Sequence, residues 1–591
     1  MSVDKRTPVK KSTSVDKNAS IENLITDHID IWTSAIKQKS ATGRGSNKKR
    51  ELYGIRKLRE LILELAVRGK LVPQDPNDEP ASVLLERIAE EKAQLVKDKK
   101  IKKPKKLPEI TEDEKPFDFP KSWEICRLGD AINVLNGRAY KKHEMLQEGV
   151  PILRVGNLFT SNEWYYSDLE LEPEKYIDNG DLIYSWSASF GPFIWTGGKV
   201  IYHYHIWKMD IYDDRSLDKF FANKYLESIS ASIKASGNGI AMIHMTKERM
   251  EKLVIPIPPI SEQHRIVAKV DELMALCDDL EAQTESSLDA HQTLVTVLLD
   301  TLVNSQNADE LAENWARFSD HFDTLFTTEH SIDQLKQTVL QLAVMGKLVQ
   351  QDPNDEPASV LLERIAAEKE QLIKDKKIKK QKTLPPISED EKPFQLPKGW
   401  EWVCLSNIGV FTGGKTPSKA NTSFWGGNIP WVTPKDMKVS LIYDSEDHVT
   451  QLAIDDGLAE ISKDSILIVA RSGILRRKLP VAITKTICTV NQDLKVLALL
   501  DTSMANYVAL MLKGFESYIL SNLTKIGTTV ESLMFDEFSK HYFMLPPLEE
   551  QHRIVAKVDE LMALCDQLKA RLNDAQTTQL QLADALTEQA L

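Results

Sequence analysis

The chain carries a 17-residue segment, EQHRIVAKVDELMALCD, twice without a change, at residues 262–278 and 550–566. Each copy follows a Pro-Pro pair, which prevents a preceding helix from running into it. Apolar residues then recur in steps of three and four, the spacing of a coiled-coil seam. The seam residues are Ile266, Val270, Leu273, Cys277 and Leu280 in the first copy, and Ile554, Val558, Leu561, Cys565, Leu568, Leu572 and Ala575 in the second. We therefore predict two long, equivalent helices.

A second pair of repeats precedes these segments. The sequence QDPNDEPASVLLERIA occurs at 74–89 and at 351–366, and KDKKIKK occurs at 97–103 and at 374–380. Both pairs are 277 residues apart, so the chain is a direct tandem repeat of about 290 residues. Helical spacing of apolar residues predicts helices over 21–35, over 55–71 and from about Pro80 onward.

The stretches between these repeats, 123–260 and 400–548, share little sequence. The distance between equivalent residues changes across them from 277 to 288. Both contain short β-like runs, at 150–155, 181–185, 429–433 and 465–470, separated by Gly-rich or aromatic turns. Each stretch is therefore predicted to be a mixed, mostly β domain inserted into a helical scaffold.

The expected fold class is α+β, with two inserted domains separated by an antiparallel pair of long helices in a pseudo-two-fold internal repeat. The expected divisions are a disordered tail (1–20), a helical region with a Lys-rich tether (21–122), the first inserted domain (123–260), a central region with a long helix, helical repeat and tether (261–399), the second inserted domain (400–548) and a final long helix (549–591).

Composition excludes several classes of protein. Apolar residues make up 42% of the chain, but no apolar run approaches the roughly 20 residues that cross a membrane. The first residues carry no apolar segment of a secretory signal, so the expected compartment is the cytoplasm. Five cysteines without a CxxC spacing fit reduced thiols. The net charge of −12 means that any nucleic-acid binding must rest on local basic clusters or on a partner.

The layout itself favours one kind of ligand. Two equal scaffolds in one chain form an internal dimer, which should bind two copies of one partner through its identical surfaces. The divergent inserts should bind two different things. Duplex DNA with an asymmetric, split sequence has this property, because a dimer reads half-sites about one helical turn apart.

The motifs of this chain resemble those of a known family. The order of tryptophan-led insert, Pro-Pro exit and EQHRIVAKVDELMALCD helix, repeated once, is similar to the specificity subunit of a type I restriction-modification enzyme. So are FTGGKTPSKANTSFWGGNIPWVTPKDM (411–437) and VNQDL (490–494), which resemble a target-recognition domain of that family. The segment LAVRGKLVPQDPNDEPASVLLERIA (65–89) resembles the subgroup with an extended N-terminal conserved region.

The resemblance implies a non-catalytic subunit. Each of two target-recognition domains would read one half of a bipartite DNA site, and the conserved helices would set the gap and dock two methyltransferase subunits. Motor-nuclease subunits would then join. The resemblance places S-adenosylmethionine, ATP and Mg²⁺ on those partners, with no cofactor on this chain.

Basic turns supply the candidate DNA contacts. Arginine can pair bidentately with guanine edges, while lysines and short polar side chains position the phosphate backbone. In the first insert the candidates are Arg138, Lys141, Lys142, Arg154, Asn157, Tyr184, Ser185, Trp186 and Lys199. In the second they are Lys415, Thr416, Ser418, Lys419, Lys435, Arg471, Ser472, Arg476, Arg477 and Lys478. A solvated hairpin is the alternative for 471–478, and core packing is favoured over base stacking for the tryptophans.

Other motifs do not predict chemistry on this chain. GVFTGGKT (409–416) matches the phosphate-loop pattern GxxxxGK[ST], but Pro417 and the glycines after it exclude the helix that this loop requires. His203 and His205 alternate as on one strand face, without a third ligand at a suitable spacing, so no metal site is predicted. No methyltransferase or nuclease motif is found, and no catalytic residue is proposed. The lysine runs 97–106 and 374–382 are interpreted as solvated tethers, with phosphate contact or an acidic partner face as the alternative.

The duplicated helices supply the candidate spacer and docking residues, which are Arg265, Val270, Leu273, Leu276, Arg553, Val558, Leu561 and Leu564. Two further hypotheses stay open. The chain could be a coiled-coil adaptor whose inserts bind proteins, or a stand-alone DNA-binding regulator. The sequence does not specify the bases that would be recognised.

Overall fold

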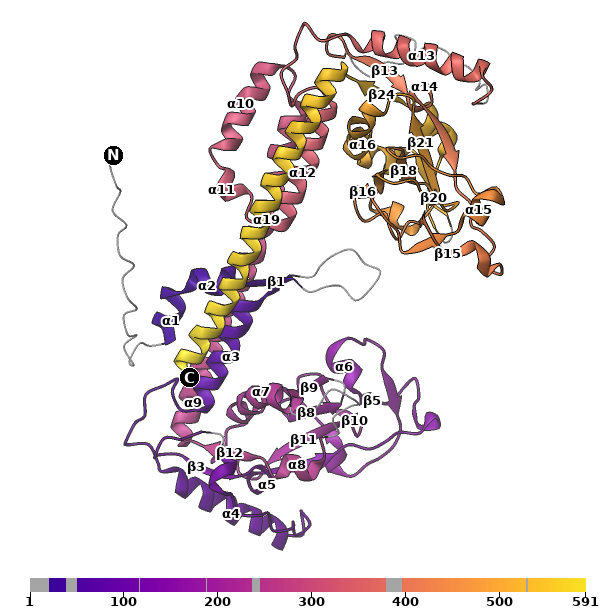
Figure 1. Ribbon diagram of the computed structural model, residues 1–591. Coiled ribbons are helices and arrows are strands. Elements are labelled where there is room, and N and C mark those ends of the chain that lie inside the picture. The colour runs from indigo at the N-terminus through magenta and orange to yellow at the C-terminus, as the bar shows by residue number, and fades with distance from the viewer. Residues whose placement is uncertain are drawn as a thin grey trace, which may run out of the picture. The chain divides into compact units, whose positions relative to one another are not determined.

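The computed structural model describes residues 21–38, 50–115, 117–187, 189–235, 245–378, 396–527 and 530–591 (Figure 1). The predicted disordered tail (1–20) and the end of the second lysine run (379–382) lie outside the described residues. The chain divides into two compact units. Unit 1 consists of Met1–Ser287 and Ala575–Leu591, and unit 2 is Leu288–Asp574.

The helical scaffold repeats in both units. Unit 1 contains α1 (Ile21–Asp27), α2 (Ile29–Ser34), α3 (Tyr53–Val67) and α4 (Ala81–Lys97). Unit 2 contains α10 (Ala308–Ser319), α11 (Phe322–Leu325), α12 (Glu329–Val344) and α13 (Ala358–Lys374). A short hairpin of β1 (Ile36–Gln38) and β2 (Arg50–Leu52) precedes α3. The predicted helix over 21–35 is two helices, because the chain breaks at His28.

Two long helices follow the inserted domains, as predicted: α9 (Ile260–Asn304) and α19 (Leu548–Ala590). Unit 1 holds the start of α9 and the end of α19, and unit 2 holds the end of α9 and the start of α19. All five seam residues of α9 are buried. In α19 the seam holds from Ile554 to Leu572, but Ala575 is exposed, so the prediction is wrong at that residue.

The first inserted domain has two four-stranded sheets and flanking helices. One sheet has the order β6-β5-β10-β7 and the other β4-β11-β8-β9, and a separate pair joins β3 to β12. The strands are β3 (Glu124–Arg127), β4 (Ile132–Asn136), β5 (Val150–Leu153), β6 (Tyr165–Ser167), β7 (Tyr176–Ile177), β8 (Leu182–Ser187), β9 (Ser189–Ile194), β10 (Val200–Tyr202), β11 (Ile206–Ile211) and β12 (Val254–Ile257). The helices are α5 (Leu128–Ala131), α6 (Val155–Phe159), α7 (Lys219–Ala235) and α8 (Lys247–Glu251).

The second inserted domain has the same plan. Its sheets have the orders β14-β21-β18-β19-β16 and β17-β15-β20, with the pairs β13-β24 and β22-β23 beside them. The strands are β13 (Glu401–Cys404), β14 (Gly409–Gly413), β15 (Trp425–Val432), β16 (Leu441–Ile442), β17 (Asp447–Val449), β18 (Ile466–Val469), β19 (Val481–Thr484), β20 (Thr489–Val490), β21 (Leu494–Leu499), β22 (Thr524–Lys525), β23 (Ser532–Leu533) and β24 (Tyr542–Leu545). The helices are α14 (Leu405–Ile408), α15 (Gln451–Asp455), α16 (Ala505–Gly514), α17 (Glu516–Asn522) and α18 (Phe535–Lys540).

Each inserted domain is closed where it leaves the scaffold. Its first and last strands pair antiparallel, β3 with β12 and β13 with β24, so the chain enters and exits at one point. Inside each unit a domain helix also packs on a scaffold helix, α7 on α3 and α16 on α12 (Figure 1). The predicted α+β fold with two mixed domains on a repeated helical scaffold is thus confirmed.

The two repeated sequences contact each other, which explains why they repeat together. The Arg265 guanidinium of the EQHR segment donates to the Asp78 carboxylate of QDPNDEP at 2.6 Å. Arg553 and Asp355 form the same pair at 2.6 Å in unit 2. The Glu262 carboxylate also accepts a hydrogen bond from Gln74 Nε2 at 2.5 Å. These contacts fix the start of each long helix against the loop that leads into α4 or α13.

Candidate nucleic-acid interface

In the second inserted domain, three loops meet at the turn Asn491–Asp493 between β20 and β21. The backbone N–H of Lys415 donates to Val490 O at 3.1 Å, and that of Arg471 donates to Asp493 O at 3.1 Å. The Thr416 hydroxyl donates to the side-chain oxygen of Gln492. The structure thereby brings together two predicted basic segments, 415–419 and 471–478, that lie far apart in the sequence.

The loop 471–478 is the basic turn that the sequence predicted. It contains a short 3₁₀ helix, Gly473–Arg476, between β18 and β19. Ser472 caps that helix, and its N–H donates to Glu531 O at 3.1 Å, while the Arg476 side chain forms an ion pair with the buried Glu531 carboxylate. Arg471 and Arg477 are exposed and make no ion pair within the described part of the chain. Arg476 thus anchors the loop, and its two neighbours carry available charge.

The phosphate-loop pattern does not form a phosphate loop. Residues 409–413 are strand β14, and the chain continues through a turn into the 3₁₀ helix Thr422–Phe424. Lys415, Ser418 and Lys419 are exposed in that turn, where Ser418 O accepts from Trp425 Nε1 at 3.2 Å. Lys435 is also exposed, beside the turn in which Asp436 accepts from the Thr433 hydroxyl at 2.8 Å. The prediction that no P-loop helix follows is confirmed.

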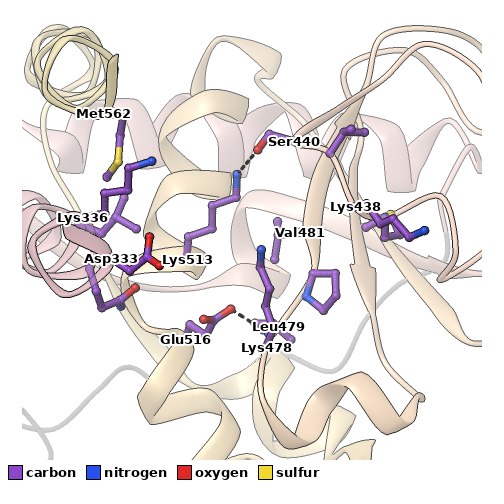
Figure 2. A pocket seen from close by; sticks show the side chains of 15 residues that line it. Asp333, Lys336, Lys438, Ser440, Lys478, Leu479, Val481, Lys513, Glu516 and Met562 are labelled. Atoms are coloured by element: carbon purple, nitrogen blue, oxygen red, sulfur yellow. Dashed lines mark hydrogen bonds between the residues drawn. The ribbon is translucent and has the colours of Figure 1, made fainter. Parts of the chain in front are cut away.

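Lys478, the last residue of the basic loop, belongs to a different environment. It lines a cavity of about 380 Å³ between α12, α16 and the loop 437–440 (Figure 2). The Lys513 ammonium donates to Ser440 Oγ there at 2.8 Å, and burial lowers the pKa of Lys513, with the nearby Lys478 acting in the same direction. The Glu516 carboxylate accepts from Leu479 N at 2.8 Å. Lys478 therefore lies at the contact between the inserted domain and the scaffold helix α12, and not beside Arg471.

In the first inserted domain, the basic turn after β4 is also present. Arg138 donates to the Glu144 carboxylate at 2.8 Å, and its guanidinium lies 5.1 Å from the centroid of the Tyr140 ring. The Arg138 N–H donates to Tyr202 O at 3.1 Å, which fixes the turn beside the end of β10. Lys141 and Lys142 are exposed, so they remain candidates for contact with DNA.

Arg154 and Asn157 lie where β5 ends, as predicted, but only one of them has a side chain that remains available for contact with DNA. The Arg154 guanidinium stacks over the Tyr165 ring at 4.7 Å from its centroid. Asn157 uses its side chain within the domain, since its Oδ1 accepts from Arg154 N at 3.1 Å and its Nδ2 donates to Glu163 O at 2.8 Å. Asn157 therefore shapes this corner, and Arg154 remains the candidate for contact.

Burial removes Tyr184 and Ser185 from the candidate surface. Both lie on β8, an inner strand of its sheet, and both are fully buried. The Tyr184 hydroxyl is 3.1 Å from Ser230 Oγ, and its ring stacks on Trp207. Trp186 is half-buried and also stacks on Trp207, at 5.6 Å between ring centroids, in line with the preferred interpretation of core packing. Lys199 is exposed, with its ammonium 4.6 Å from the Tyr176 ring centroid.

His203 and His205 do not share a strand, contrary to the sequence interpretation. They flank Tyr204 in the turn between β10 and β11, with their ring centroids 4.8 Å apart. Burial lowers the pKa of His203 to about 4, and His205 and Arg154 act in the same direction, so His203 is neutral at pH 7. Within the described ranges, no three His, Cys, Asp or Glu side chains are grouped to hold a metal ion.

The helix candidates also divide by exposure. Val270, Leu273 and Val558 are buried in the seam, so they space the helices and cannot meet a partner; Leu561 is half-buried. Leu276 and Leu564, which are equivalent in the two copies, are 40% and 52% exposed. Arg265 and Arg553 are already paired with aspartates of their own units.

Sequence reasoning missed Tyr204 and Gln492, the middle residues of the two turns that organise these loops. Neither is charged, and neither stands in a basic cluster. The available signal was a short polar interruption between two apolar runs, HYH in one domain and NQD in the other.

Comparison with known proteins assigns this chain to a family. The family profile described as type I restriction modification DNA specificity domain matches residues 120–290 and 397–575, which are the two inserted domains with the starts of the long helices. The chain belongs to the type I restriction enzyme specificity subunits. The predicted family is thereby confirmed.

Relatives match over nearly the full chain. The specificity subunits of the type I restriction enzymes EcoAI and EcoEI of Escherichia coli are each 42% identical to it, over 97% of this chain and 100% of the relative. Among solved structures, the HsdS subunit from Thermoanaerobacter tengcongensis is similar at 17% identity with a TM-score of 0.40, covering 81% of this chain and 98% of that one. In the described residues, every helix is too short or too polar to cross a bilayer.

Proposed function

We propose that this specificity subunit reads an asymmetric, bipartite DNA site, with one target-recognition domain for each half-site. The observation that supports this most directly is the contrast between the two units. Their scaffold helices repeat in sequence and structure, whereas the loops that carry the candidate basic residues, around Arg138 and Arg154 in one domain and Lys415 and Arg471 in the other, differ. Equal scaffolds with unequal loops suit a ligand with two different ends.

The long helices are proposed to dock two methyltransferase subunits. Leu276 and Leu564 support this, because they are exposed apolar residues at the same position of identical 17-residue segments. Two copies of one partner could use them equally. Motor-nuclease subunits would join this core.

Catalysis would then be carried out by the partner subunits. We infer that this chain has a recognition and assembly role without catalysis of its own, and that it acts in the cytoplasm. S-adenosylmethionine, ATP and Mg²⁺ would be bound by the other subunits.

Selection from labelled random duplexes tests the proposal. The purified chain is mixed with the duplexes alone and together with a methyltransferase subunit, and bound DNA is sequenced. The expected result is enrichment of one split sequence chiefly in the presence of the partner. A protein-binding adaptor would give no enrichment in either arm, and a stand-alone regulator would give full enrichment without the partner.

A further inference from the structure

The two recognition domains share a hydrogen-bonded frame around turns of unrelated sequence. In the first domain, His203 N donates to Leu153 O at 2.9 Å, and Trp186 N donates to His205 O at 3.2 Å. In the second, Asn491 N donates to Val432 O at 3.0 Å, and Arg471 N donates to Asp493 O at 3.1 Å. The bonds from Arg138 N to Tyr202 O and from Lys415 N to Val490 O complete the match, at 3.1 Å each.

A glycine at the same place in each domain confirms that the frames are equivalent. A Cβ on Gly137 would lie 2.4 Å from His203 O, and a Cβ on Gly414 would lie 2.1 Å from Asn491 O. Both distances are far below van der Waals contact, so each turn packs directly on glycine backbone. The frame therefore holds the backbone of 203–205 and of 491–493 in corresponding positions.

The frame uses the first and third residues of each turn and leaves the middle side chain outside. Tyr204 is 40% exposed, and Gln492 is also exposed. The two domains thus present different chemical groups from the same structural position. A position with a fixed backbone and a variable, exposed side chain is suited to selecting between ligands.

The surroundings of Gln492 orient it for contact with DNA. The Thr416 hydroxyl donates to the Gln492 side-chain oxygen, and Gln492 Nε2 donates to Asp493 Oδ2 at 3.5 Å, so the amide is held at both ends. Lys415 and Arg471, on the two segments bonded to the turn, are exposed and without an ion pair in the described residues, so they can neutralise flanking phosphates. The second N–H and the second oxygen lone pair of this amide remain available, and together they match the N7 acceptor and N6 donor of adenine in the major groove.

Tyr204 has a comparably fixed setting. Its carbonyl accepts from Trp186 Nε1 at 2.9 Å, and its ring lies 4.0 Å from that of His205 between centroids. Arg154, which follows the Leu153 carbonyl bonded to His203, supplies positive charge beside the turn, whereas Arg138, on the segment bonded to the turn, is paired with the Glu144 carboxylate. The tyrosine side chain offers an apolar ring and a hydroxyl to the same kind of surface.

We propose that Gln492 and Tyr204 are specificity-determining residues that contact base edges, with Gln492 pairing with an adenine in the half-site of the second domain. Thr416 is then a positioning residue for Gln492. This inference rests on the proposed function, in which each domain reads one half-site.

Methylation profiling of the assembled complex on a duplex library tests it. Gln492→Ala should reduce discrimination at one base pair of one half-site by about 5- to 150-fold, the range expected for one bidentate pair, and leave the other half-site unchanged. Gln492→Glu replaces the amide donor by an acceptor and should shift preference at that base pair from adenine toward cytosine. Tyr204→Ala should relax one position of the opposite half-site only.

Two control variants separate recognition from folding. Gln451→Ala removes an exposed glutamine elsewhere in the domain of Gln492, and Tyr443→Ala removes an exposed tyrosine of that same domain; both should leave the profile unchanged. The inference is overturned if Gln492→Ala and Gln492→Glu leave the profile unchanged, or lower methylation equally at every sequence. If the unmodified complex shows no sequence preference at all, the proposed function fails instead.

Discussion

Glu550 is a buried carboxylate at the start of α19, and its titration should affect stability. Burial raises its pKa above the ordinary value of 4.5, while the hydrogen bond from Trp400 Nε1, at 3.0 Å, and the charge of Arg553 act in the opposite direction. An acid with a raised folded pKa stabilises the fold in its protonated form. That contribution is complete below pH 4.5 and is lost as the pH rises through the folded pKa.

Glu550→Gln should therefore remove this loss, because a neutral amide keeps an oxygen for Trp400 at every pH. The variant should therefore have a higher melting temperature than the unmodified chain at pH 8. The difference should shrink toward pH 4.5. Thermal unfolding between pH 4.5 and 8 measures this difference in melting temperature. The control is Glu549→Gln, which changes the exposed carboxylate next to Glu550. The prediction would be contradicted if the melting temperatures of Glu550→Gln and the unmodified chain changed in parallel with pH.

At the residue scale, charge was visible in the sequence and burial was not. Lys415 and Arg471 could be proposed because each stands in a basic turn between apolar runs. Tyr184 and Ser185 were also candidates for DNA contact. Their burial could not be predicted, because only the strand order β4-β11-β8-β9 shows that β8 is an inner strand. Gln492 was missed because its position depends on contacts with residues 76 positions earlier, at Thr416.

At the scale of elements, helical periodicity predicted the scaffold well. The helix predicted over 55–71 is α3, Tyr53–Val67, and it ends where Gly69 takes a φ of 67°. The strands predicted at 150–155 and 465–470 are β5 and β18. Pairing between strands came only from the structure, because β5 meets β10 in parallel although the two strands are far apart in the chain, a contact that no local pattern records.

The length of α9 should set the number of base pairs between the half-sites. Four residues inserted after Glu281 lengthen the helix by about 6 Å and rotate the residues beyond the insertion by only about 40° more than one full turn. That length is roughly two base-pair rises. Methylome sequencing should therefore show a longer gap with the same bases in both half-sites.

The same four residues inserted after Gly457 provide the control. Gly457 lies in an exposed turn with open space around it, so the insertion leaves α9 intact and should leave the gap unchanged. An unchanged gap in the α9 variant would show that this helix does not act as the spacer.

At the scale of the whole molecule, the tandem repeat could be found from the sequence alone, because it requires only that the chain be compared with itself. Its reason became clear only from contacts. The pairs Arg265–Asp78 and Arg553–Asp355 show that the two repeated segments form one junction in each unit. Each inserted domain begins and ends beside that junction on a two-stranded pair, β3-β12 or β13-β24.

Because of this closure, we expect the inserted domains to be exchangeable. Replacing residues 400–548 by the corresponding domain of another specificity subunit should change one half-site and leave the other, because the β13-β24 pair closes before α19 begins. The replacement should keep a tryptophan at position 400, whose Nε1 donates to Glu550 in the helix after the domain. The reciprocal exchange of 123–260 serves as the matched control and should change only the opposite half-site. Methylome sequencing of cells carrying each chimera measures both, and a chimera that altered both half-sites would show that the domains do not read DNA independently.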